Sequence, residues 1–168
     1  MNILFIFIII LIVYECILLI YRKYKRRNIY RLAKERSIKT GLPLLVIGDP
    51  YNGVTSTFTG PDYDCGDMCL DITGAPKCKN ALKMRLEDFN DFSNYIVFIS
   101  CTLEYVDDLP FIIRKLKNMN IENLFIVHIE PYSTTKWLYP NFLTGESKPK
   151  YTIHKAPPHH HEIIYSII

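Results

Sequence analysis

Residues 95–131, YIVFISCTLEYVDDLPFIIRKLKNMNIENLFIVHIEP, constrain the fold more than any other stretch of this chain. Two short apolar runs, 95–99 and 124–129, are rich in β-branched and aromatic residues, which is typical of strands buried on both faces. Between them, an acidic pair (Asp107, Asp108) and the first-turn Pro110 signal the start of a helix over residues 109–119. A strand, a helix and a second strand in this order predict a βαβ unit with parallel strands.

Shorter patterns elsewhere extend this sheet. Residues 42–49 (LPLLVIGD) are a further apolar run that ends sharply, and residues 69–72 (CLDI) predict a short strand. Residues 80–94 are polar and mixed, with a short helix expected at 86–92. Alternating strands and helices indicate an α/β, Rossmann-like, mostly parallel sheet over residues 42–168. Two late strands, 151–154 and 162–168, are expected to close it as an antiparallel hairpin.

The first residues predict a membrane anchor. Residues 3–21 are apolar except for Glu15, and as a helix they would measure about 28 Å, close to the hydrocarbon thickness of a bilayer. A cleaved signal peptide would need a charged n-region and a small-residue cleavage site, which this start lacks. We therefore expect residues 1–21 to be a transmembrane helix with the lipid bilayer as its partner.

The segment 22–41 is expected to be a basic juxtamembrane helix. Residues 21–39 hold nine Lys or Arg and one Glu. By the positive-inside rule this cluster stays in the cytosol, so the domain should face the cytosol. From residue 40 onward acidic residues outnumber basic ones, and a mildly acidic domain gives no reason to expect nucleic-acid binding.

The five cysteines show no spacing typical of a disulfide framework or of paired zinc knuckles. We expect them to stay reduced in the cytosol and predict no metal site. An open alternative is a metal site formed by the clustered cysteines and a histidine run. Its ligands would be Cys65, Cys69, Cys78, His159, His160 and His161.

Polar residues follow the predicted strands, at the edge where ligands bind in open α/β sheets. Three stretches carry a resemblance: LLVIGDPYNG (44–53), MCLDI (68–72) and NYIVFISCTLEYVDDLPFIIRKLKN (94–118). They resemble the first strand with its glycine loop, the second strand, and the fourth strand with its helix in class I S-adenosylmethionine-dependent methyltransferases. The style of the motifs also resembles proteins of large DNA viruses, in which case the membrane would be that of the host cell or the virion.

The resemblance implies S-adenosylmethionine as cofactor and methyl transfer to an unknown acceptor. The cofactor-binding positions that it implies are Gly48, Asp49, Gly53, Asp71, Asp88, Ser100 and Glu104. In the family, the acidic residue at the position of Asp71 binds the ribose hydroxyls. The first loop departs from the family because it has only two glycines and because Pro50 lacks an N–H. The alternative is a catalytically inactive, membrane-tethered Rossmann-like module for structure or protein interaction.

Overall fold

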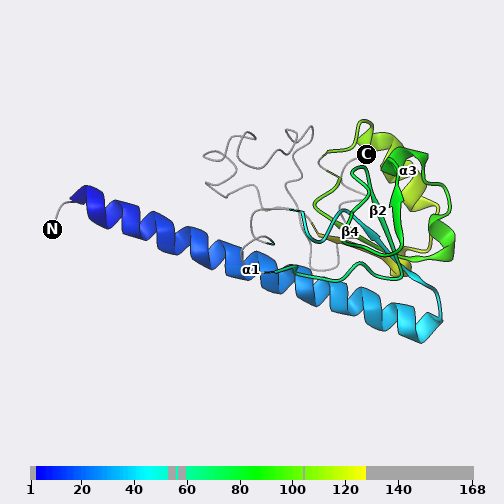
Figure 1. Ribbon diagram of the computed structural model, residues 1–168, viewed down its shortest axis with the longest axis horizontal. Coiled ribbons are helices and arrows are strands. Elements are labelled where there is room, and N and C mark those ends of the chain that lie inside the picture. The colour runs from blue at the N-terminus through cyan, green and yellow to red at the C-terminus, as the bar shows by residue number, and fades with distance from the viewer. Residues whose placement is uncertain (1–2, 53–55, 57–59, 104, 128–168) are drawn as a thin grey trace.

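The computed structural model describes residues 3–52, 56, 60–103 and 105–127 (Figure 1). In this part of the chain, one five-stranded sheet has the order β3-β2-β1-β4-β5, and every neighbouring pair is parallel. Its strands are β1 (Leu44–Ile47), β2 (Met68–Asp71), β3 (Ala81–Lys83), β4 (Ile96–Ser100) and β5 (Leu124–Val127). The helices are α1 (Ile3–Thr40) and α3 (Leu109–Lys117), with short 3-10 turns η1 (Leu86–Asp88), η2 (Phe92–Asn94) and η3 (Ile121–Asn123). The predicted α/β parallel sheet is confirmed, whereas the predicted hairpin lies outside the described residues.

The βαβ unit is present as β4, α3 and β5, with the two strands paired in parallel. The start of α3 follows from its sequence, because the Asp108 carboxylate accepts a hydrogen bond from the Phe111 N–H (2.9 Å). Pro110 lies in the first turn, where its missing N–H costs nothing. The second strand of the unit is described as far as Val127.

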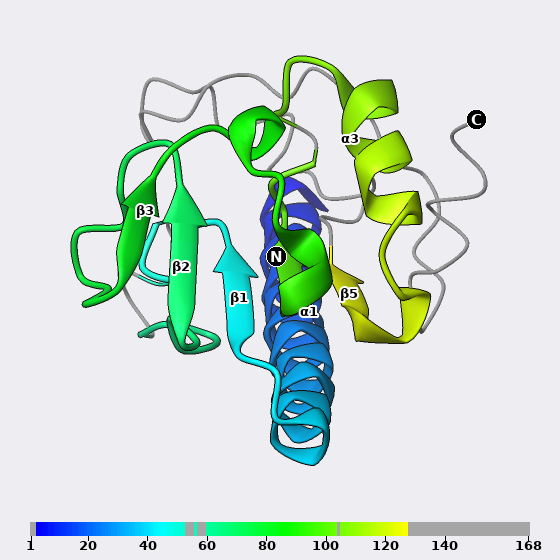
Figure 2. The ribbon, with the colours of Figure 1, turned by 90° about the vertical axis from the view of Figure 1, so that its right-hand side faces the viewer.

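Both faces of the sheet are covered at its centre, so β1 is apolar at every position and β4 is apolar up to Ser100 at its end. Leu45 and Ile47 of β1 pack toward α3, whereas Leu44 and Val46 pack toward α1. Figure 2 shows the sheet between these two helices. Side chains alternate between the two faces of a strand, so two buried faces require an unbroken apolar run.

Helix α1 is a single unbroken helix of 38 residues. Its amino half carries exposed large apolar side chains and extends away from the sheet (Figure 1), and it is long and apolar enough to cross a membrane. Its second half packs on the sheet through the buried Ile29, Tyr30 and Ala33. The helix ends before Gly41, which has a φ of +74° and donates its N–H to Ser37 O (2.8 Å). The basic segment is therefore both a continuation of the apolar half of α1 and one layer of the α/β fold.

The edge strand β3 was not predicted. It has three residues, two of them exposed, so its sequence lacks an apolar run. The helix expected at 86–92 is limited to η1, and a separate 3-10 turn, η2, begins at Phe92.

Candidate functional site at the carboxyl edge of the sheet

The strand order reverses between β1 and β4. From β1 the chain builds outward through β2 to β3, and it then returns to place β4 on the other side of β1. In open α/β sheets this reversal is where ligands bind, beyond the carboxyl ends of the strands. We call the residues there the carboxyl edge: 48–52 after β1, 71–74 at the end of β2, and 100–103 at the end of β4.

Gly48 brings the ends of β1 and β4 into direct contact. Its φ is +99°, and a Cβ at this position would lie 2.6 Å from Thr102 Oγ1 and 3.1 Å from Ser100 O. Only glycine fits this position without strain or displacement of Thr102. The Thr102 hydroxyl is itself held by Ile47 O (3.2 Å) and Ser100 O (3.1 Å).

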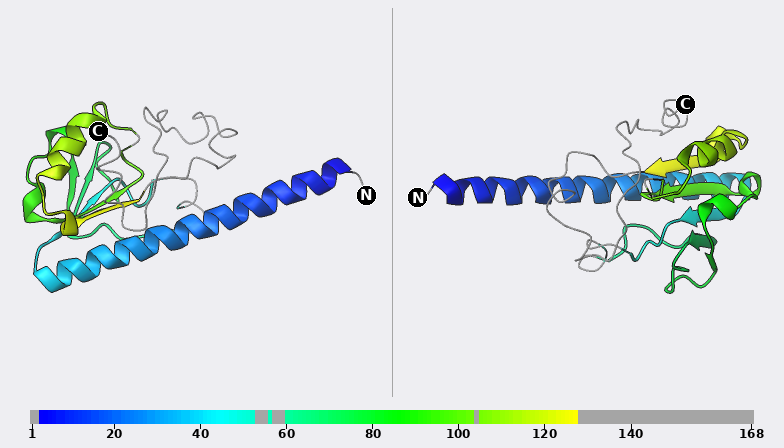
Figure 3. Two further views of the ribbon diagram at one scale, coloured as in Figure 1. Left: turned by 180° about the vertical axis from the view of Figure 1, so that it is seen from behind. Right: turned by 90° about the horizontal axis from the view of Figure 1, so that it is seen from above.

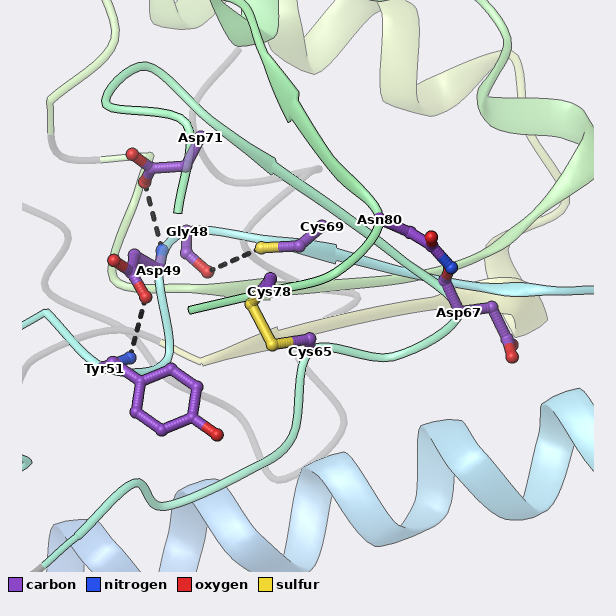
Figure 4. The surroundings of a disulfide bond; sticks show 9 residues. All are labelled: Gly48, Asp49, Tyr51, Cys65, Asp67, Cys69, Asp71, Cys78 and Asn80. Atoms are coloured by element: carbon purple, nitrogen blue, oxygen red, sulfur yellow. Dashed lines mark hydrogen bonds between the residues drawn. A yellow bond between two sulfur atoms is a disulfide. The ribbon is translucent and has the colours of Figure 1, made fainter. Parts of the chain in front are cut away.

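Asp71 joins the end of β2 to the loop that follows β1. Its Oδ2 accepts a hydrogen bond from the Asp49 N–H (3.0 Å; Figure 4). Its Oδ1 accepts from the N–H (2.7 Å) and the hydroxyl (2.5 Å) of Thr73. The structure thus brings together Gly48, Asp49 and Asp71, and it uses the Asp71 carboxylate to order two turns.

Asp49 shapes its own turn. Its Oδ1 accepts from the Tyr51 N–H (2.8 Å), and its carbonyl accepts from the Asn52 N–H (3.2 Å). This is the usual behaviour of an Asp that precedes Pro in a turn. A direct role of its side chain in ligand binding stays a prediction.

The end of β4 contains a polar cluster that the sequence did not predict. Cys101 has a φ of +55°, and its Sγ accepts a hydrogen bond from Arg26 Nη2 of α1 (3.1 Å). Arg26 also pairs with the buried Asp62 (3.2 Å). The electrostatic interaction with Cys101 is the largest cause that raises the pKa of Arg26 above its ordinary value, against the lowering effect of burial. Arg26 therefore remains charged and links α1 to the carboxyl edge.

Tyr63 fills the space beside Ser100. Its ring packs against Tyr30 (5.7 Å between centroids) and edge-on against Phe98 (4.9 Å), and its hydroxyl hydrogen-bonds with the Ser100 side chain. Burial raises the pKa of Tyr63 above its ordinary value, although the hydrogen bond with Ser100 opposes this effect. Ser100 is itself buried. Ser100 thus lies close to Gly48, as predicted, but its hydroxyl is already partnered.

The remaining predicted positions do not join this group. Asp88 is exposed at the end of η1, a segment held against α3 by Lys115, whose ammonium donates to Glu87 O and to Phe89 O (3.2 Å). Gly53 and Glu104 lie outside the described residues.

The expectation that all cysteines are reduced is wrong for two of them. Cys65 and Cys78 form a disulfide that joins the segment before β2 to the turn after it (Figure 4). The two residues are 13 positions apart with no recognisable motif spacing, so only the return of the chain after β2 brings them together. Cys69 stays a thiol that donates to Gly48 O (3.8 Å), and burial raises its pKa to about 12. Among the residues described, no group of three His, Cys, Asp or Glu side chains is arranged to hold a metal ion, and the three histidines lie outside them.

A groove of about 310 Å³ lies next to the disulfide. It is lined by Tyr51, Asp64, Cys65, Gly66, Lys79 and Asn80. Of these residues only Tyr51 belongs to the carboxyl edge, so most of the groove is formed by the segments that lead into β2 and β3.

In comparisons with known proteins, no protein-family model, no curated protein and no solved structure matches the chain.

Proposed function

We propose that this chain is a membrane-anchored, methyltransferase-like protein that binds S-adenosylmethionine at the carboxyl edge and transfers its methyl group to an acceptor. The observation that carries the proposal is the reversal of strand order between β1 and β4, with Gly48 and Asp71 meeting beside it. This placement of a glycine and an acidic strand end is the one that the three sequence stretches imply.

The residues present fit a nucleoside in part. A carboxylate has about four acceptor positions, and Asp71 uses three of them within the protein. One position therefore remains for a ribose hydroxyl. Because Gly48 has no side chain, a ligand can approach the backbone closely at this point.

When bound, S-adenosylmethionine would supply an electrophilic methyl group on a sulfonium. The work of the protein in such a reaction is to hold the acceptor in line and to exclude water, so a conspicuous acid–base set is not required. In this chain, Gly48, Asp49 and Asp71 would hold the nucleoside part.

Calorimetric titration of the full chain in detergent with S-adenosylhomocysteine tests the proposal. We expect saturable binding heat in the wild type and its loss in Asp71→Asn, which removes the charge that orders the loop after β1. Glu35→Gln, an exposed position on α1 that pairs with Arg31, is the matched control and should titrate like the wild type. A flat titration of folded wild-type protein would exclude a site of this kind.

A second candidate is a membrane-tethered module without cofactor. It is favoured by the side chains that already occupy the carboxyl edge, since Tyr63 fills the space beside Ser100 and Asp71 is hydrogen-bonded three times. The described groove also lies mostly away from this edge. The same titration separates the two candidates, because this one predicts no heat.

Two observations bear on the side of the membrane that the domain faces, and they favour opposite sides. The basic cluster after residue 21 supports our proposal that the domain faces the cytosol. The Cys65–Cys78 disulfide favours the opposite side, because disulfides persist mainly in oxidising compartments. The redox state of this one bond in the cell is therefore a direct measure of orientation.

A further inference from the structure

Helix α1 runs antiparallel to the strands that it covers. Arg26 reaches Cys101, directly after β4, whereas Arg36 reaches Asn123, directly before β5 (3.1 Å in each case). Ten helical residues span about 15 Å, which matches the length of a strand of about five residues. Figure 3 shows the strand arrows pointing toward the amino-terminal end of α1. The carboxyl edge therefore faces the apolar half of the helix.

The distance between that edge and the apolar half is short. The apolar segment ends at Tyr21, and the exposed Tyr21 and Tyr24 are aromatic residues of the kind found at membrane interfaces. Five helical residues, or about 7.5 Å, separate Tyr21 from Arg26. The polar headgroup layer adds about 5–8 Å to each side of the hydrocarbon core. Cys101 and its neighbours consequently lie at the outer boundary of this layer.

The sheet is packed directly on the second half of α1, and no flexible linker separates it from the apolar half of this helix. The helix has no break between its exposed half and the residues that enter the core, Ile29, Tyr30 and Ala33. Polar contacts hold both ends of the packed half, with Arg26 on Asp62 and Arg36 on Glu122 (2.7 Å). Because the connection is rigid, the direction of α1 determines the orientation of the sheet.

We propose that the carboxyl edge docks against the headgroup layer of the bilayer that α1 enters, so that any ligand of this edge is met at the membrane surface. Arg27, which is exposed, and the neighbouring basic residues of α1 favour an anionic lipid surface. The attraction of each basic residue near such a surface contributes about 1 kcal/mol to binding. The inference depends on α1 crossing the membrane and not on methyl transfer. It holds for the cofactor-free module as well.

Energy transfer to a labelled lipid tests the docking. The full chain, with its single Trp137 changed to Phe, is placed in phosphatidylcholine–phosphatidylserine nanodiscs that contain headgroup-dansylated lipid. Asn52→Trp reports on the carboxyl edge, and Ser93→Trp, also exposed but in η2 just before β4, is the matched control at the opposite edge. Because the two edges are about 15 Å apart along the strands, we expect at least about twofold more transfer from position 52.

Equal transfer from the two positions, or stronger transfer from position 93, would overturn the docking. Release of the wild-type chain from membranes by carbonate would overturn it as well, because the anchor on which it depends would be absent. Neither result bears on the calorimetric titration, so docking and cofactor binding fail separately.

Discussion

Gly48→Ala is the substitution whose cost the geometry of the carboxyl edge defines most sharply. A Cβ at φ +99° costs about 1–2 kcal/mol in backbone strain. The same Cβ would lie 2.6 Å from Thr102 Oγ1, so this hydroxyl must move away from Ile47 O and Ser100 O. Loss of these bonds adds about 0.5–1.5 kcal/mol. We expect the free energy of unfolding of the domain to fall by about 3 kcal/mol.

Gly41→Ala is the matched control. Gly41 also has a positive φ, +74°, but a Cβ there meets nothing within 4 Å, so only the strain of about 1–2 kcal/mol applies. The difference between the two variants isolates the collision with Thr102. Urea unfolding of the full chain in detergent, followed by near-ultraviolet circular dichroism of the packed tyrosines, measures both.

A double-mutant cycle with Thr102→Ala assigns that difference to one contact. Removing Oγ1 from the wild type should destabilise it, whereas removing it from Gly48→Ala should cost about 1 kcal/mol less, because the collision disappears together with the hydroxyl. The reasoning is refuted if Gly48→Ala costs no more than Gly41→Ala, or if the effects of Gly48→Ala and Thr102→Ala simply add.

Three further predictions concern the cysteines. Burial raises the pKa of Cys69 to about 12 from an ordinary value of 9.0. The contribution of this protonated thiol to the free energy of unfolding is therefore fully present below pH 9.0 and is lost as the pH rises toward 12. Cys69→Ala should flatten this decline, and pH-dependent urea unfolding checks it; an unchanged slope would contradict the burial of the thiol. Opening the Cys65–Cys78 bond, which closes a loop of 13 residues, should cost about 3 kcal/mol of stability, measured with and without reductant. In cell membranes, alkylation after denaturation should label Cys65 and Cys78 without reductant if the domain faces the cytosol, and protection until reductant is added would place it on the oxidising side.

The parts of the fold that the sequence predicted are those in which one local pattern decides the structure. Strands β1, β4 and β5 lie in the middle of the sheet or under α1 and are therefore apolar, except for Ser100 at the end of β4. Helix α3 was predicted from Asp108 and Pro110, whose effect is confined to the first turn. Strand β3 escaped prediction because it is an exposed edge whose pairing with β2, and not its composition, makes it a strand.

The candidate site could be predicted only as far as the topology of the sheet fixes it. Parallel strands end on one edge, so the approach of Gly48, Asp71 and Ser100 follows from the strands alone. The contact of Arg26 with Cys101 joins residues 75 positions apart, and that with Asp62 joins residues 36 apart. No local pattern encodes such contacts. They arise because α1 packs on the sheet, and α1 as a whole shows almost no amphipathic pattern from which this packing could be predicted.

The basic residues that follow the apolar half of α1 consequently have two separable roles, one in the packing of the domain and one in the topology that we propose. Arg26 and Lys23 both approach the buried Asp62, at 3.2 and 3.5 Å, so their charges belong to the fold as well as to the topology signal. Arg27 lies on the same turn but is exposed. A change of orientation caused by Arg26→Gln would therefore combine a lost topology signal with a weakened domain, because the buried Asp62 would lose its ion pair with Arg26 and would keep the longer one with Lys23. The same substitution at Arg27 removes an equal charge from the juxtamembrane segment and leaves that buried pair intact, and it is the position at which the positive-inside rule can be judged on its own.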